Sequence, residues 1–141
     1  MKKKPILKEQ MNRQYYYLFG LSVMLMLLAF TIESPQSLLN GMMTILVSPS
    51  QLFTDYMQIA SIGSTLLNVA IMLLINIYSY KKLEIPVNGT VIGSLGMLAG
   101  FSFFGKNLFN SIPFMIGVWI YTKVTKQNYR NYVIVGLFGS S

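Results

Sequence analysis

Long stretches of this chain carry no positive charge, and this spacing most constrains what it can fold into. No lysine or arginine lies between Arg13 and Lys81. Short basic connections between long apolar stretches are typical of a membrane protein whose basic loops stay in the cytoplasm. All basic residues except Lys106 fall into three clusters: Lys2, Lys3, Lys4, Lys8 and Arg13; Lys81 and Lys82; and Lys123, Lys126 and Arg130.

The composition excludes an ordinary soluble domain. Only 11% of the 141 residues are charged and 53% are hydrophobic, whereas about a quarter of the positions in a soluble domain are charged. The formal net charge of +7 could suggest a nucleic-acid partner, but the basic residues are confined to the short connections. We therefore expect the lipid bilayer as partner and no nucleic acid.

The residue types argue against an enzyme. The chain has no Cys and no His, which removes thiol nucleophiles, imidazole bases and the usual zinc ligands. Its four carboxylates are far apart in sequence, so a paired-carboxylate or metal-dependent hydrolase is not expected. We predict no catalytic residues, no metal and no cofactor. The carboxylates are Glu9, Glu33, Asp55 and Glu84.

The apolar stretches predict an all-α integral membrane protein that forms a single domain over residues 1–141. We expect about four transmembrane helices, a cytoplasmic amino terminus and a basic cytoplasmic tail at 1–14. The predicted spans are 15–32, 56–80, 85–105 and 107–122.

The first span would be about 27 Å long as a helix, close to the thickness of the hydrocarbon core. Tyr15, Tyr16 and Tyr17 are expected at the level of the lipid headgroups, as an aromatic belt. A basic start before an apolar core also resembles a signal peptide. However, no small-x-small cleavage site precedes Pro35, which favours an uncleaved anchor.

Two apolar segments are too short to cross. Residues 38–47 would span only about 15 Å, so the segment is re-entrant or interfacial. A full crossing there would also place Lys81 and Lys82 outside. The second short segment, 132–141, begins a further apolar stretch. Either the tail ends in the interface, or the chain is the first part of a longer protein.

Polar side chains gather on one face of the predicted span 56–80. At helical spacing they fall within a sector of about 120°. Unpartnered amides are costly in hydrocarbon, so this face must contact protein or water. It could hold helices together, or it could line a hydrated path through Asn68 and Asn76. The sector contains Gln58, Ser61, Ser64, Thr65, Asn68, Asn76 and Ser79.

Glycines form a ridge on the predicted span 85–105. Small residues spaced three and four apart let another helix approach closely, and we expect this ridge to pack against the polar face of 56–80. The predicted packing residues are Gly89, Gly93, Gly96 and Gly100.

Lys106 is the one basic residue outside the clusters, and it follows Gly105, which can break a helix. A new helix could begin near Pro113 with Ser111 as its cap, or a helix could run unbroken from Lys106. Interrupted helices of this kind mark binding sites in transporters. Alternatively, Lys106 reaches the outer interface along its aliphatic stem.

We therefore predict a polar constriction at the non-cytoplasmic side, where Lys106 meets Asn107 and Asn110. Such a site would favour an anion or a carbonyl oxygen. Asp55 is predicted on the same side and could neutralise Lys106.

With these strings in view, the chain resembles the uncharacterised bacterial membrane-protein family known as domain of unknown function 1576, over about residues 34–139. The resemblance implies a multi-pass fold of which this chain matches an amino-terminal portion, and it implies no site residues. It rests on Ser48-Pro49, Thr54-Asp55-Tyr56, Val87-Asn88-Gly89, Gly100-Phe101, Phe104-Gly105-Lys106-Asn107, Asn110 and Pro113.

Two functions fit the sequence. The first is a permease or channel-like component in a bacterial inner membrane that moves a small polar or anionic solute. It would act as a homo-oligomer or together with a missing carboxyl-terminal portion, because inverted-repeat transporters need a partner repeat. The alternative is a non-transporting assembly or accessory protein, in which the polar sector and the glycine ridge serve only helix packing.

Overall fold

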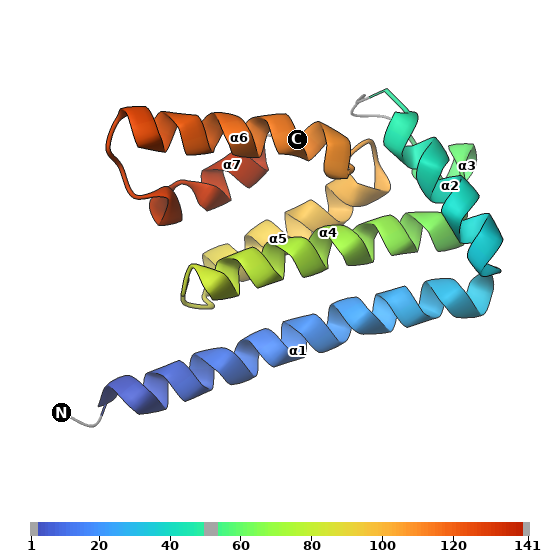
Figure 1. Cartoon of the computed structure of the whole chain (residues 1–141). Coiled ribbons are helices and arrows are strands. Elements are labelled where there is room, and N and C mark those ends of the chain that lie inside the picture. The colour runs from blue at the N-terminus through green and yellow to red at the C-terminus, as the bar shows by residue number, and fades with distance from the viewer. Residues whose placement is uncertain (1–2, 50–53, 140–141) are drawn as a thin grey trace.

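The computed structural model describes residues 3–49 and 54–139, and within these ranges the fold is all-α, as predicted (Figure 1). One isolated antiparallel bridge joins Asp55 to Phe104. The elements are α1 (Lys3–Ile32), α2 (Pro35–Val47), α3 (Tyr56–Ile59), α4 (Ile62–Lys82), α5 (Gly89–Phe103), α6 (Leu108–Val124), the 3₁₀ helix η1 (Tyr129–Asn131) and α7 (Val133–Gly139).

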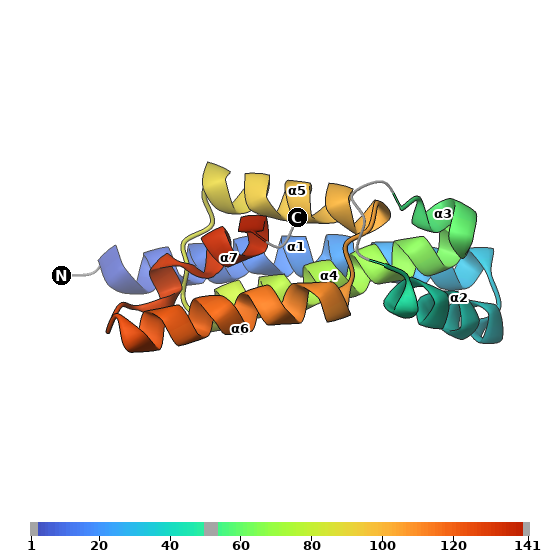
Figure 2. The same ribbon diagram turned by 90° about the horizontal axis from the view of Figure 1, so that it is seen from above.

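The core lies where α1 and α5 pack against α4 (Figures 1 and 2). Met72 and Ile77 of α4 are fully buried there, as is Leu98 of α5. Tyr15 of α1 is also fully buried, and its hydroxyl donates to the carbonyl of Ile85 at 2.7 Å. Tyr15 is therefore packed inside the bundle, where its hydroxyl finds a carbonyl acceptor. Its depth at the level of the headgroups stays a prediction. Only its neighbours Tyr16 and Tyr17 are exposed.

Helix α2 contains the predicted short segment 38–47 and lies across the end of the bundle. It begins with Pro35 in its first turn and Ser34 as its cap, an arrangement that suits a helix start. The carbonyl of Leu38 accepts from the Ser64 hydroxyl at the start of α4. One end of α2 therefore contacts α4, and its other end reaches the start of α6.

The predicted span 56–80 is interrupted. Ala60 has φ −121° and ψ −93° and ends the single-turn helix α3. Ser61 then caps α4 by accepting from the backbone N–H of Ser64 at 3.1 Å. A serine in extended conformation is a favourable helix start, and this local bond separates α3 from α4.

The glycine ridge does not pack against α4. A Cβ built on Gly89, Gly93, Gly96 or Gly100 would meet nothing within 4 Å. The opposite face of α5 is buried instead, through Val91, Leu95 and Leu98 with Ser94 and Ser102. The apolar side chains bury more surface against α4 than glycines can, and the glycine face is left exposed.

Two helices of the described chain are long and apolar enough to cross a membrane: Glu9–Ile32 and Ile62–Lys82. Helix α5, with 15 residues, and helix α6, with 17, are shorter. The structure thus supports two of the four predicted spans by length and composition.

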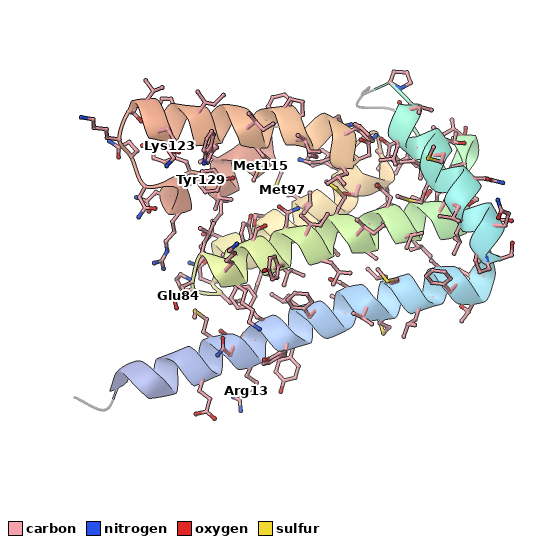
Figure 3. All side chains as sticks on the ribbon, viewed as in Figure 1. Arg13, Glu84, Met97, Met115, Lys123 and Tyr129 are labelled. Atoms are coloured by element: carbon pink, nitrogen blue, oxygen red, sulfur yellow. The ribbon has the colours of Figure 1, made fainter. Side chains whose placement is uncertain are left out.

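Basic residues from distant parts of the chain lie at one end of the bundle. Figure 3 shows Arg13, Glu84, Lys123 and Tyr129 toward this end. The α4–α5 and α6–η1 connections also lie here, whereas the α5–α6 connection lies at the other end (Figure 1).

Candidate functional site: the buried α5–α6 junction

The α5–α6 junction, residues 104–107, places Lys106 inside the protein. The backbone N–H groups of Phe104 and Lys106 both donate to the carbonyl of Phe101, at 2.9 and 3.1 Å. Gly105 has φ 84°, a conformation that glycine adopts without strain. This turn ends α5 and leaves Lys106 only 3% exposed.

Asn68 of α4 fixes the junction from one side. Its amide donates to the carbonyl of Ser102 at 2.9 Å and to the carbonyl of Lys106 at 3.0 Å. Both amide hydrogens are therefore engaged with backbone at the helix break. Asn68 is 1% exposed, so its role here is to hold the broken helix ends.

Asn107 and Asn110 build the start of α6. The side chain of Asn107 accepts from the backbone N–H of Asn110, and the side chain of Asn110 accepts from the backbone N–H of Asn107, at 3.1 and 2.9 Å. This reciprocal capping box satisfies two amino-terminal donors. Asn110 also donates to the carbonyl of Gly105 at 2.5 Å. The helix then runs unbroken through Pro113, so the alternative start near Pro113 is excluded.

Asn107 also ties the junction to the segments before α4. Its amide donates to the carbonyl of Ile45 at 2.8 Å and to the hydroxyl of Tyr56 at 3.1 Å. The start of α6 is therefore attached to the end of α2 and to α3.

Asp55 lies close to the junction, and its carboxylate caps the start of α3. Its bridge with Phe104 brings it near, and its carboxylate accepts from the backbone N–H of Met57 at 2.9 Å. Asp55 thus caps α3, and its neutralisation of Lys106 stays a prediction.

The electrostatic feature of the junction is the buried Lys106. It lies in the connection outside both helices, and burial lowers its pKa to about 8. It remains largely protonated at neutral pH and sits beside the amino terminus of α6, whose dipole also favours negative charge. A buried ammonium near a helix start suits an anion or a polarised carbonyl.

Asn76 is not part of this junction. It lies two turns further along α4, and its amide donates to the carbonyl of Met72 in its own helix at 2.8 Å. It lines a separate groove of about 370 Å³ between α4 and α6, which we call the α4–α6 groove. The structure therefore brings together Lys106, Asn107, Asn110 and Asn68, with Asp55 at the edge, but not Asn76.

Sequence reasoning missed a second polar cluster, around Glu33 at the α1–α2 corner. The Glu33 carboxylate accepts from the Ser61 hydroxyl at 2.8 Å and from the backbone N–H of Gly63 at 3.0 Å. A Cβ on Gly63 would lie 2.8 Å from the Glu33 carboxyl carbon, and one on Gly41 would lie 2.0 Å from Ser64 Oγ. The sequence signal for this cluster is a carboxylate directly after one helix, Glu33, together with a Ser-x-Gly motif at the start of another, residues 61–63.

The fold defines an all-helical protein with two helices fit to cross a membrane and a buried polar junction at one end. Residues 34–141 match the family described as Protein of unknown function (DUF1576), and the chain belongs to that family. The resemblance seen in the sequence is thereby confirmed. No curated protein and no solved structure matches the chain.

Proposed function

We propose that this chain is a multi-pass protein of a bacterial inner membrane. The exposed surface of α1 supports this placement: Leu21, Met24, Leu27 and Phe30 are 48–61% exposed. Water would make such a continuous apolar surface unfavourable, whereas lipid covers it. Helix α1 is anchored in the core by Tyr15, which agrees with an uncleaved anchor.

The basic end faces the cytoplasm in this proposal. Lys81 lies over the ring of Tyr16 at 4.2 Å, and Lys123 lies over the ring of Trp119 at 5.7 Å. Basic residues beside interfacial aromatic rings are typical of a cytoplasmic membrane boundary. The α5–α6 junction then lies toward the opposite side, with α2 across it as an interfacial helix.

Within this membrane protein, we infer that the junction is part of a pathway for a small polar or anionic solute. The observation that carries this inference is Lys106, an ammonium only 3% exposed where two short helices meet. Ionisable groups inside membrane proteins are costly and commonly serve function. Short helices that meet at a break are also typical of transporter sites.

One copy of the chain is not expected to enclose a pathway. The exposed glycine face of α5 allows a further helix to approach. We therefore propose action as a homo-oligomer or within a larger assembly.

The test is anion flux in proteoliposomes, with chloride, inorganic phosphate and glutamate as probes. Lys106→Met should reduce the flux of at least one probe to that of empty vesicles. The matched control Lys126→Met changes an exposed lysine at the opposite end and should keep the flux. Equal flux for Lys106→Met and the unchanged protein, or no flux for any probe with the unchanged protein, would refute the transport function.

A non-transporting assembly or accessory role is the second candidate. It is favoured by the amides of Asn68 and Asn107, whose donors are engaged with protein groups rather than facing a cavity. This role predicts that Asn68→Ala weakens complex formation or stability while the flux experiment shows nothing.

A further inference from the structure

The α4–α6 groove has a lining that is apolar in character despite its polar residues. Two of its polar side chains donate to carbonyls of their own helix: Asn76 to Met72 and Ser79 to Ile75, both at 2.8 Å. Ser111 likewise donates to the preceding turn of α6 at 2.8 Å. The remaining lining includes Met115 and Trp119. Because most of the lining is apolar and these three side chains already donate to backbone carbonyls, the groove suits a hydrocarbon chain better than a polar solute.

The groove leads toward lysines on both of its walls. On α4 the lining residues end at Ser79, and Lys82 follows three positions later on the same face. On α6 the lining residues end at Trp119, and Lys123 follows four positions later, with its ammonium 5.7 Å from the Trp119 ring centre. Helical spacing therefore places one lysine beyond the end of each wall.

A third cation stands at the same end. Tyr129 of η1 lines the groove, and the adjacent Arg130 donates to the backbone carbonyl of Glu84 at 2.6 Å. Arg130 is thereby held near the groove, and the residue is exposed. Glu84, in the α4–α5 connection, supplies a carboxylate near this end. None of the described residues that line the groove is an aspartate or a glutamate.

We propose that the α4–α6 groove holds one acyl chain of an anionic phospholipid of the cytoplasmic leaflet, with its phosphate near Lys82, Lys123 and Arg130. The apolar lining accounts for the acyl chain, and the charge complementarity selects an anionic headgroup over a zwitterionic one. Basic pockets between helices on the cytoplasmic side are suited to such headgroups. The proposal rests on the membrane orientation proposed above, but not on solute transport.

The single tryptophan of the chain is Trp119, so its fluorescence reports lipid contacts at this one position, on the wall of the groove. The protein is reconstituted into phosphatidylcholine vesicles containing a small, equal fraction of dibrominated phosphatidylglycerol or dibrominated phosphatidylcholine. Bromine on an acyl chain quenches a tryptophan that it contacts. Phosphatidylglycerol should quench Trp119 more strongly than phosphatidylcholine at equal mole fraction.

The decisive variant is Lys82→Gln with Lys123→Gln. Each lysine near a membrane surface contributes about fivefold to the binding of anionic lipid, so the preference should fall by about 25-fold. The matched control, Arg13→Gln with Lys81→Gln, removes the same charge at the same end, but on the α1 side, where Lys81 lies over Tyr16. It should keep the preference.

The outcomes separate the lipid site from the wider proposal. Equal quenching by the two brominated lipids, or equal loss of preference in both double variants, would overturn the lipid site while leaving the membrane placement intact. No quenching by either lipid would overturn the membrane placement and the lipid site together. Loss of solute flux in the experiment with Lys106→Met has no bearing on any of these results.

Discussion

Replacing Asn68 tests whether the junction depends on one buried amide. Asn68→Leu keeps the branching at Cγ but removes the donor that reaches the carbonyls of both Ser102 and Lys106. Side-chain hydrogen bonds between membrane helices average about 0.6 kcal/mol and reach about 1.7 kcal/mol. Two lost bonds, together with two buried carbonyls left without this donor, should lower the free energy of unfolding by about 1–3 kcal/mol.

Asn76→Leu is the matched control, on the same helix and two turns away. The Asn76 amide bonds to the carbonyl of Met72, which also accepts the Asn76 backbone N–H in the regular helix pattern. Removing that amide leaves no carbonyl without a donor, so the free energy of unfolding should change by less than about 0.5 kcal/mol.

The assay is reversible unfolding in dodecyl maltoside micelles with increasing dodecyl sulfate, followed by circular dichroism. The result that would refute the reasoning is an equal loss for the two variants, or a larger loss for Asn76→Leu. A hydrated path lined by both residues predicts instead that both variants change solute flux with similar, small effects on stability.

Three further predictions concern packing and one buried hydrogen bond, and they are measured in the same titration. Gly41→Ala should lower the free energy of unfolding by about 1–3 kcal/mol, because the new Cβ would lie 2.0 Å from Ser64 Oγ. Gly96→Ala should instead raise it by up to about 1 kcal/mol through helix propensity, since a Cβ there meets nothing within 4 Å; the reverse order would show that the faces are wrongly assigned. Tyr15→Phe should lower it by about 1 kcal/mol through loss of the bond to the Ile85 carbonyl, and unchanged stability would count against that bond.

The approximate positions of α4 and α5 were predictable because each lies in a long apolar stretch that ends at basic residues or at a glycine. Lys81 and Lys82 close α4, and Gly105 ends the segment before Lys106. The polar sector was also recognised as a face that must contact protein or water, and Asn68 of this sector is buried. These features depend on neighbours in sequence, which a single chain displays directly.

The choice of face on α5 was not predictable in the same way. Glycine spacing shows that a close approach is possible, but not that a partner is present. The buried residues Val91, Leu95 and Leu98 lie opposite the glycines, and both faces are compatible with a membrane helix. Only the tertiary arrangement determines which face meets α4.

The partners of the junction also lay beyond the reach of the sequence. Asn107 reaches Ile45 and Tyr56, which are 62 and 51 positions away. The string around Lys106 correctly indicated a break with polar residues beside it. It could not indicate that the amides bind backbone carbonyls, because those carbonyls come from segments distant in the chain.

The central claim is tested most directly by measuring on which side of the membrane each end of the bundle lies. The chain has no cysteine, so single cysteines can be introduced at exposed positions of both ends. Gln36 lies in the first turn of α2 and Lys126 follows α6, and both are exposed. In intact spheroplasts, a membrane-impermeant maleimide should label Gln36→Cys at once, and Lys126→Cys only after permeabilisation. Labelling of both from outside, of neither, or in the opposite order would contradict a membrane protein with its basic end in the cytoplasm.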